Sequence, residues 1–206
     1  MGIQMDDQIL RFVYIEAMRD ATLQKAYDNP DKKWLKSNEI YKMVEDDLKE
    51  LVYKVTTERF KSEKEYDDYF YNVIKTIRCK INEKKEENKE FTFGNTQKLL
   101  NIMLKYFYIY SYNNDDIKSR FKYCHCPMDG QMMEYLWKNR EKIKIDKIKK
   151  EFVISWGDLD FNDDSIIPEQ YIEYQSAIRE MIKEDDRVDN EMSPIEYDYY
   201  IWSQLE

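Results

Sequence analysis

Glycine, proline, cysteine and histidine are scarce in this chain of 206 residues, which contains four Gly, four Pro, three Cys and one His. So few chain breakers favour long helices over sheet. The shortage of glycine leaves no Walker A or dinucleotide-binding pattern, and a single histidine excludes most mechanisms that need several. Two of the cysteines lie in Cys124-His125-Cys126, so we expect a reducing compartment and no disulfide framework.

Long hydrophobic runs are missing as well. No stretch approaches the length of a membrane span, and the N-terminal sequence MGIQMDDQIL has acids where a signal peptide needs positive charge. We therefore expect a cytoplasmic protein with no membrane contact and no cofactor. The oligomeric state is left open.

Aromatic and charged residues, in contrast, are plentiful, at 15% and 36% of the chain. The length is sufficient to bury a sizeable core. We expect an all-α fold, in which residues 1–206 form a single domain of about seven helices around a central apolar helix, with at most one or two short strands. The charged segment 83–92 is a possible internal boundary, and segment 143–156 can be read as helix or strand.

Several helix starts can be predicted from capping patterns. Ser62 and Ser193 each begin a capping box, and the central helix is expected from about Asn95 to Tyr112, with Asn95 as its N-cap. Pro127 fits the first position of a later helix, which would put Asp129 at its third position. In the last helix we expect Tyr199, Trp202 and Leu205 to form the apolar side.

The central helix also carries a narrow polar face. Lys98, Asn101 and Lys105 are spaced i, i+3 and i+7, which aligns them along an otherwise apolar helix. One interpretation is a pocket for an anionic small molecule such as a nucleotide, with both lysines on the phosphate and Asn101 orienting it. The other is the solvent side of an amphipathic helix, with the lysines reaching water.

His125 and Asp129 form the second candidate site, four residues apart at a helix start. A carboxylate so placed can orient an imidazole, and the pair could act as acid and base, or grip a nucleotide, beside the lysines. The alternative is structural: Asp129 accepts hydrogen bonds from the free amides of the first turn, and His125 bonds a backbone group.

Two metal sites are also considered, and neither matches its motif fully. Cys124-His125-Cys126 could bind zinc with Cys79, but the spacing differs from that of structural zinc sites. An acidic loop resembles the EF-hand calcium loop, although Asp163 replaces its glycine and Pro168 falls at position 11. Its candidate ligands are Asp158, Asp160, Asn162 and Glu169.

Charge is unevenly distributed along the chain, which has a net charge of −9. Residues 157–206 hold 15 acidic and three basic side chains, whereas segment 138–150 holds seven basic ones. These two segments could face each other in the fold. Direct nucleic-acid binding through 138–150 is not favoured, because the chain is acidic and the segment lacks a stacking platform.

The runs FGNTQKLLNIMLKYF and HCPMD, together with Trp156 and segment 194–202, resemble uncharacterised helical proteins of bacteria and their phages. That resemblance implies a helical fold and no particular activity. We expect a non-catalytic accessory protein that engages or inhibits a protein partner through its acidic, Tyr-rich C-terminal quarter, by competing for a surface that binds nucleic acid. The alternative is the anion pocket, which could be an enzyme using His125 and Asp129.

Overall fold

A computed structural model describes residues 6–26, 37–83, 90–142, 156–161 and 167–204. The predicted all-α fold is confirmed: these residues contain eight α-helices and no strand. The helices are α1 (Asp7–Ala26), α2 (Ser37–Thr57), α3 (Glu63–Asn82), α4 (Phe93–Tyr110), α5 (Asp115–Lys118), α6 (Gly130–Asn139), α7 (Glu169–Glu184) and α8 (Pro194–Trp202). Short 3-10 turns add η1 (Ser119–Phe121), η2 (Arg140–Lys142) and η4 (Trp156–Asp158).

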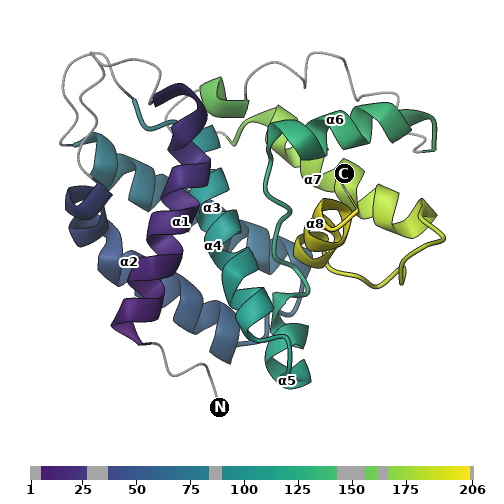
Figure 1. Ribbon diagram of the computed structural model, residues 1–206, viewed down its shortest axis with the longest axis horizontal. Coiled ribbons are helices and arrows are strands. Elements are labelled where there is room, and N and C mark those ends of the chain that lie inside the picture. Colours follow the sequence, from purple (N-terminus) through teal and green to yellow (C-terminus); the bar gives the residue numbers. More distant parts are fainter. Residues whose placement is uncertain (1–5, 27–36, 84–89, 143–155, 162–166, 205–206) are drawn as a thin grey trace.

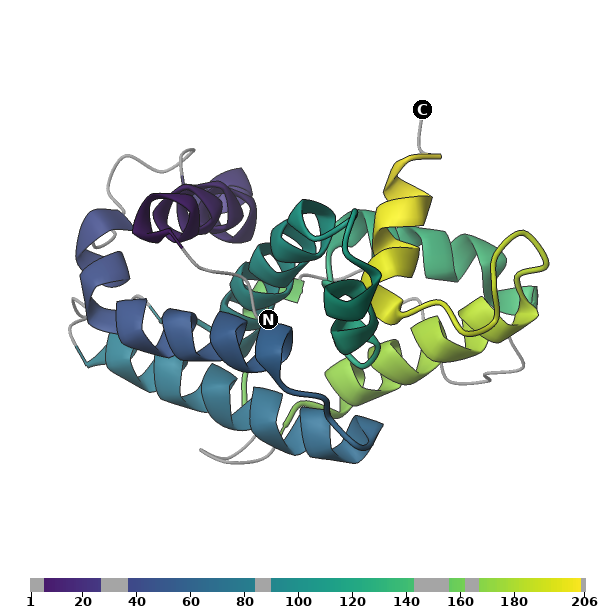
Figure 2. The same ribbon diagram turned by 90° about the horizontal axis from the view of Figure 1, so that it is seen from below.

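Helix α4 lies in the middle of the molecule, as predicted for the most apolar helix. Helices α1 and α3 pack against it on one side, with α2 against both of them, and α6, α7 and α8 lie on the other side (Figures 1 and 2). Thirteen of its 18 residues are buried, including its polar side chains Gln97, Lys98 and Asn101. The core of the protein is therefore built around a helix that carries charge and amides as well as apolar side chains.

Ser62 and Ser193 cap their helices as predicted, but the second half of the predicted capping box differs at α3, where the Glu65 carboxylate accepts from Lys61 N at 2.7 Å. The Ser62 hydroxyl accepts a hydrogen bond from the backbone of Glu65 at 3.2 Å, and the Ser193 hydroxyl accepts one from the backbone of Glu196 at 3.3 Å. Each bond satisfies one of the amides that the first turn of a helix leaves free. Both starts could be predicted because the cap and its partner are three residues apart.

Two other helix starts differ from the prediction. Helix α4 is capped by Thr92, and Asn95 is the reciprocal member of a capping box, because its side chain bonds back to Thr92. Helix α6 begins at Gly130, so Asp129 is its N-cap and accepts a hydrogen bond from Met132 N at 2.9 Å. Pro127 stays in an extended segment because Gln97 and other side chains satisfy the backbone there.

The predicted apolar side of α8 is wrong. Tyr199 and Trp202 are 42% and 40% exposed, whereas Ile195 and Ile201 face the core together with the fully buried Asp198. The large aromatic side chains suggested one face, but an aspartate occupies the middle of the buried one. Leu205 lies outside the described residues.

Segment 143–155, predicted as helix or strand, lies outside the described residues, and Trp156 begins the 3-10 turn η4. The Asn82 side chain makes two hydrogen bonds to the backbone of Phe91, so the end of α3 lies beside the residues that lead into α4. None of the described helices has both the length and the apolar character needed to cross a membrane.

Candidate functional site

An extended segment runs through the interior between η1 and α6, and we call residues 124–129 the crossing segment. All six of its residues are buried. It passes between α4 and the C-terminal helices on its way from α5 to α6 (Figure 1). Because it has no helix or sheet partner, its backbone N–H and C=O groups have to be satisfied by other means.

Two buried glutamines satisfy much of that backbone. Gln97 of α4 donates to the carbonyl of Met128 at 2.9 Å and accepts from its N–H at 3.1 Å. Gln175 of α7 makes the same pair of bonds to Cys126, at 2.7 and 3.1 Å. Each amide side chain thus replaces a neighbouring strand, which holds the crossing segment in place between α4 and α7.

His125 is fully buried and lies between two side chains from different helices. Its Nε2 is 2.7 Å from a carboxylate oxygen of Asp67, and its Nδ1 is 3.0 Å from the hydroxyl of Tyr171. Asn101 donates to that hydroxyl at 2.9 Å. A consistent proton arrangement has Nε2–H donating to Asp67 and Tyr171 donating to Nδ1, which makes the imidazole neutral.

Burial lowers the pKa of His125, and the nearby Arg179 lowers it further, although Asp67 acts in the opposite direction. Burial also raises the pKa of the Tyr171 phenol well above 10. A hydroxyl, an imidazole and a carboxylate in a row are the groups of a nucleophilic triad. In this arrangement, however, the phenol of Tyr171 stays protonated, and Asn101 and aromatic rings enclose it. The hydrogen bonds that join Asp67 and Tyr171 to His125 therefore hold the crossing segment in its orientation.

The proton arrangement can be tested, because His125 is the only histidine in the chain. In nitrogen-15 NMR spectra at neutral pH, we expect a neutral imidazole protonated at Nε2, and we expect Asp67→Asn to change the tautomer balance. Since the folded pKa lies below the unfolded value of 6.5, this group contributes stability above pH 6.5 that is lost as the pH falls through the folded pKa. A charged imidazole at pH 7 would contradict the assignment.

The two lysines of the predicted polar face have different environments. Lys105 pairs with Asp198 of α8, with 2.8 Å between Nζ and Oδ2, and their side chains are 14% and 0% exposed. The two groups are oppositely charged and almost completely removed from water, so they form a buried ion pair. Burial opposes the charged ammonium, yet the pKa of Lys105 is raised because Asp198 lies beside it.

Lys98 lies on the same face of α4, about two turns before Lys105. Its ammonium is 4.4 Å from the centre of the Trp156 ring. The residue is 8% exposed. Burial lowers its pKa, while the charges of Asp129 and Asp20 partly offset that effect. A cation over an indole is stabilised by the negative face of the ring, so Trp156 replaces part of the hydration that the ammonium has lost.

The five predicted site residues are therefore all buried or nearly so. Lys98, Lys105 and Asp129 lie close enough to act on one another electrostatically, whereas each residue makes its direct contacts with a different partner. His125 pairs with Asp67 and Tyr171, Asp129 caps α6, and Asn101 bonds Tyr171 and Gln97. Lys105 is neutralised by Asp198. Lys105 is therefore occupied by a carboxylate of the chain, whereas Lys98 meets the ring of Trp156, and the anion pocket stays a prediction.

Asp67, Tyr171 and Asp198 are the partners that sequence reasoning missed. Asp198 could have been found, because it lies between Ile195 and Ile201 at helical spacing on a buried face, and a buried acid needs a cation. No local sequence pattern predicts the contacts of Asp67 and Tyr171, because they meet His125 only through the packing of α3 and α7.

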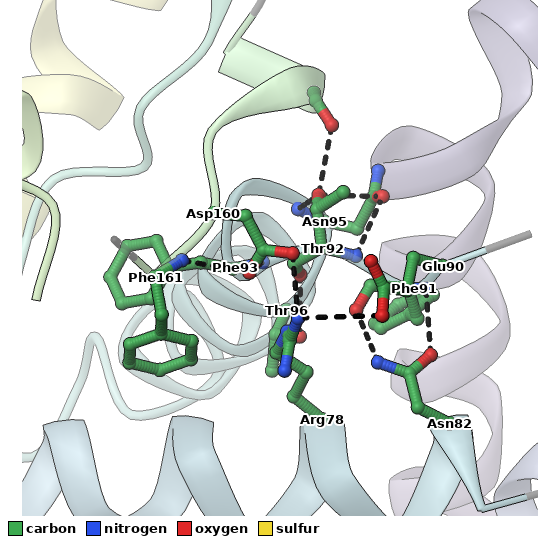
Figure 3. Close-up of polar contacts among 11 residues, drawn as sticks. Arg78, Asn82, Glu90, Phe91, Thr92, Phe93, Asn95, Thr96, Asp160 and Phe161 are labelled. Carbon is green, nitrogen blue, oxygen red and sulfur yellow. Dashed lines mark hydrogen bonds and ion pairs between the residues drawn. The ribbon is translucent and has the colours of Figure 1, made fainter. Parts of the chain in front are cut away.

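The predicted calcium loop meets the start of α4, where Asp160 already has partners (Figure 3). Its carboxylate lies 2.6 Å from Arg78 and accepts a hydrogen bond from Phe93 N at 3.2 Å. The Thr92 hydroxyl also donates to the carbonyl of Gly157 at 2.8 Å. The Asp160 carboxylate therefore pairs with Arg78 and accepts a hydrogen bond at the N-terminus of α4, where the helix dipole favours negative charge.

The other metal candidates are scattered. Glu169 is exposed at the start of α7, and Asn162 lies outside the described residues. Cys79 is exposed, whereas Cys124 and Cys126 are buried. Within the described part of the chain, no group of three or more His, Cys, Asp or Glu side chains is placed to bind a metal ion.

Comparisons with known proteins complete the description of the site. No family model, curated protein or solved structure matches this chain.

Proposed function

We propose that this chain is a non-catalytic accessory protein of a bacterium or phage that binds a protein partner through α8 and the loop before it. The observation that carries the proposal is the exposure of acidic and aromatic side chains on consecutive parts of this C-terminal region. The partner surface it fits is basic, with apolar anchor points, as on a protein that binds nucleic acid.

The acidic part of this surface is the end of α7 and the α7–α8 loop. Four of its acids are exposed: Glu184, Asp186, Asp189 and Glu191. The one basic residue of the loop, Arg187, is held by Asp185 at 2.7 Å and does not neutralise these four. A run of unneutralised acids raises the rate of encounter with a basic partner and makes binding sensitive to salt.

The aromatic part is smaller than the composition suggests. Of the tyrosines in this region, Tyr171, Tyr174 and Tyr197 are buried, so they support the fold rather than the surface. Tyr199 and Trp202 remain exposed on α8. Aromatic side chains of this kind supply much of the binding energy at protein interfaces.

The neighbouring end of α4 extends this aromatic surface. Ile109 and Tyr112 are 38% and 57% exposed, and α4 packs directly against α8. Tyr112 and Tyr199 both lie close enough to Tyr108 to affect its hydroxyl electrostatically. Together the exposed side chains make a patch at which an apolar part of a partner can be buried beside the acidic loop.

Cross-linked capture from a bacterial lysate tests the proposal with two matched variants. The first replaces the four exposed acids of this acidic surface with Asn or Gln. The control makes the same change at four exposed acids on the other side of the molecule, in α2, just after it and at the end of α3: Asp46, Glu50, Glu58 and Glu83. We expect the first variant to lose the captured partner and the control to keep it, because only the former removes charge from the binding surface.

Two further measurements sharpen the result. Tyr199→Ser with Trp202→Ser should weaken capture without changing its salt dependence, and the captured partner should be released by duplex DNA if it binds nucleic acid. Equal capture by both acid variants would contradict the proposed surface.

A further inference from the structure

Lys98 differs from the other lysines of the described chain because it is the one that is buried. No carboxylate among the described residues lies within 4.0 Å of its ammonium, the limit for an ion pair. The ammonium lies 4.4 Å from the centre of the Trp156 ring. A buried amine without an adjacent counter-charge is destabilised in its charged form.

The position of Trp156 over this amine is fixed by backbone contacts. Gly94 lies one turn before Lys98 on α4, and its N–H donates to the carbonyl of Leu159 at 2.8 Å. Because Gly94 has no side chain, the carbonyl of Trp156 can pass against the helix at that point. The turn η4 is thus held on the first turn of α4, which places the indole above the next turn.

Lys105 provides an internal comparison on the same helix face. Its ammonium is paired with Asp198, which raises its pKa, whereas burial lowers that of Lys98 and the positive charge of Lys105 adds to the effect. At a given pH, more of Lys98 than of Lys105 is therefore the neutral amine, which is the nucleophilic form.

We propose that Lys98 is a reactive amine, positioned to condense with a small aldehyde or ketone. The neutral nitrogen attacks the carbonyl carbon, the carbon–oxygen double bond is replaced by a carbon–nitrogen double bond, and the oxygen leaves as water with the two protons of the amine. The protonated imine carries the same positive charge as the original ammonium, so it retains the favourable contact with the Trp156 ring.

The cover over the amine is incomplete, because Lys98 is still 8% exposed. Trp156, whose ring lies over the Lys98 ammonium, is itself only partly buried. A compound with few atoms can enter there more easily than a nucleotide. The predicted anionic ligand is disfavoured at this place, because Asp129 and Asp20 contribute negative charge around Lys98.

Reductive trapping tests the proposal. The full chain is incubated with a limiting amount of propanal and cyanoborohydride, which reduces an imine to a stable secondary amine, and the modified lysines are located by peptide mass spectrometry. We expect Lys98 to be the main site, with loss of that adduct in Lys98→Arg and its retention in Lys105→Arg. Arginine keeps a cation over the indole, so the fold should survive.

The pH dependence separates a reactive amine from a merely accessible one. Labelling of Lys98 should rise at lower pH than labelling of Lys138, whose side chain is 68% exposed. Label distributed over the exposed lysines with none on Lys98, or no label at all in the folded protein, would overturn the proposal. Should Lys98→Arg fail to fold, the distribution of label in the unmodified chain decides the question alone.

Discussion

Replacing Lys105 with Met is expected to destabilise the protein by about 3–5 kcal/mol at pH 7.5, the usual cost of removing one partner from a buried ion pair. The reason is that Asp198 is fully buried and would lose the cation beside it. Burial raises the pKa of Asp198 to about 6 even with Lys105 present. Equilibrium denaturation in urea measures the change in the free energy of unfolding.

The control for this substitution is Lys138→Met, which removes an exposed lysine paired with Glu134. Exposed pairs contribute little, so we expect a change within about 0.5 kcal/mol. Adding Asp198→Asn to Lys105→Met should recover part of the lost stability, because the amide is neutral. A Lys105→Met variant as stable as the control would show that the pair contributes nothing.

The cost of Lys105→Met should also shrink in acid. The pKa of Asp198 is higher in the folded chain, at about 6, than the 3.8 of the free side chain. The folded protein therefore takes up this proton first, and the contribution of Asp198 to stability increases as the pH falls through 6, and is complete below 3.8. At pH 5 the unpaired carboxyl of the variant is neutral, so less is lost than at pH 7.5.

Gly94→Ala is expected to have the second large effect. A Cβ at this position would lie 1.8 Å from the carbonyl oxygen of Trp156, far inside contact distance, and both groups are backbone that cannot rotate away. Overfilled sites of this kind cost about 1–3 kcal/mol or more. We expect a lower midpoint of thermal unfolding, together with weaker protection of the Leu159–Gly94 hydrogen bond in amide exchange.

Gly130→Ala is the matched control, because nothing lies within 4 Å of a Cβ at Gly130. That glycine is the first residue of α6, where Ala is the better helix former, so the change should be neutral or stabilising by up to about 1 kcal/mol. If Gly94→Ala and Gly130→Ala unfolded at the same temperature, the close approach of Trp156 to α4 would not contribute to the stability of the fold.

Much of the helical architecture could be predicted from local spacing. Ser62 and Ser193 predict the starts of their helices because the cap and its partner are three residues apart. Helix α4 could be predicted as the central helix from its apolar composition. Asp129 was harder to place, because Pro127 fits a helix start equally well. Its true position depends on Gln97, which is 31 residues away from Met128.

The candidate site shows why tertiary partners escape a single sequence. Lys98, Asn101 and Lys105 do share a face of α4, but that pattern is the same whether the face meets water, a ligand or another helix. Asp198 meets Lys105, and Asp67 meets His125, only because helices distant in sequence pack together. No local periodicity encodes which acid will lie opposite which base.

The crossing segment has a consequence for how the chain folds as it is synthesised. Its backbone depends on Gln97, which emerges early, and on Gln175, which emerges 49 residues after Cys126. Until α7 has left the ribosome, one side of the segment has no partner for its N–H and C=O groups. We therefore expect the nascent chain to keep this interior open and to close it only after the C-terminal helices arrive.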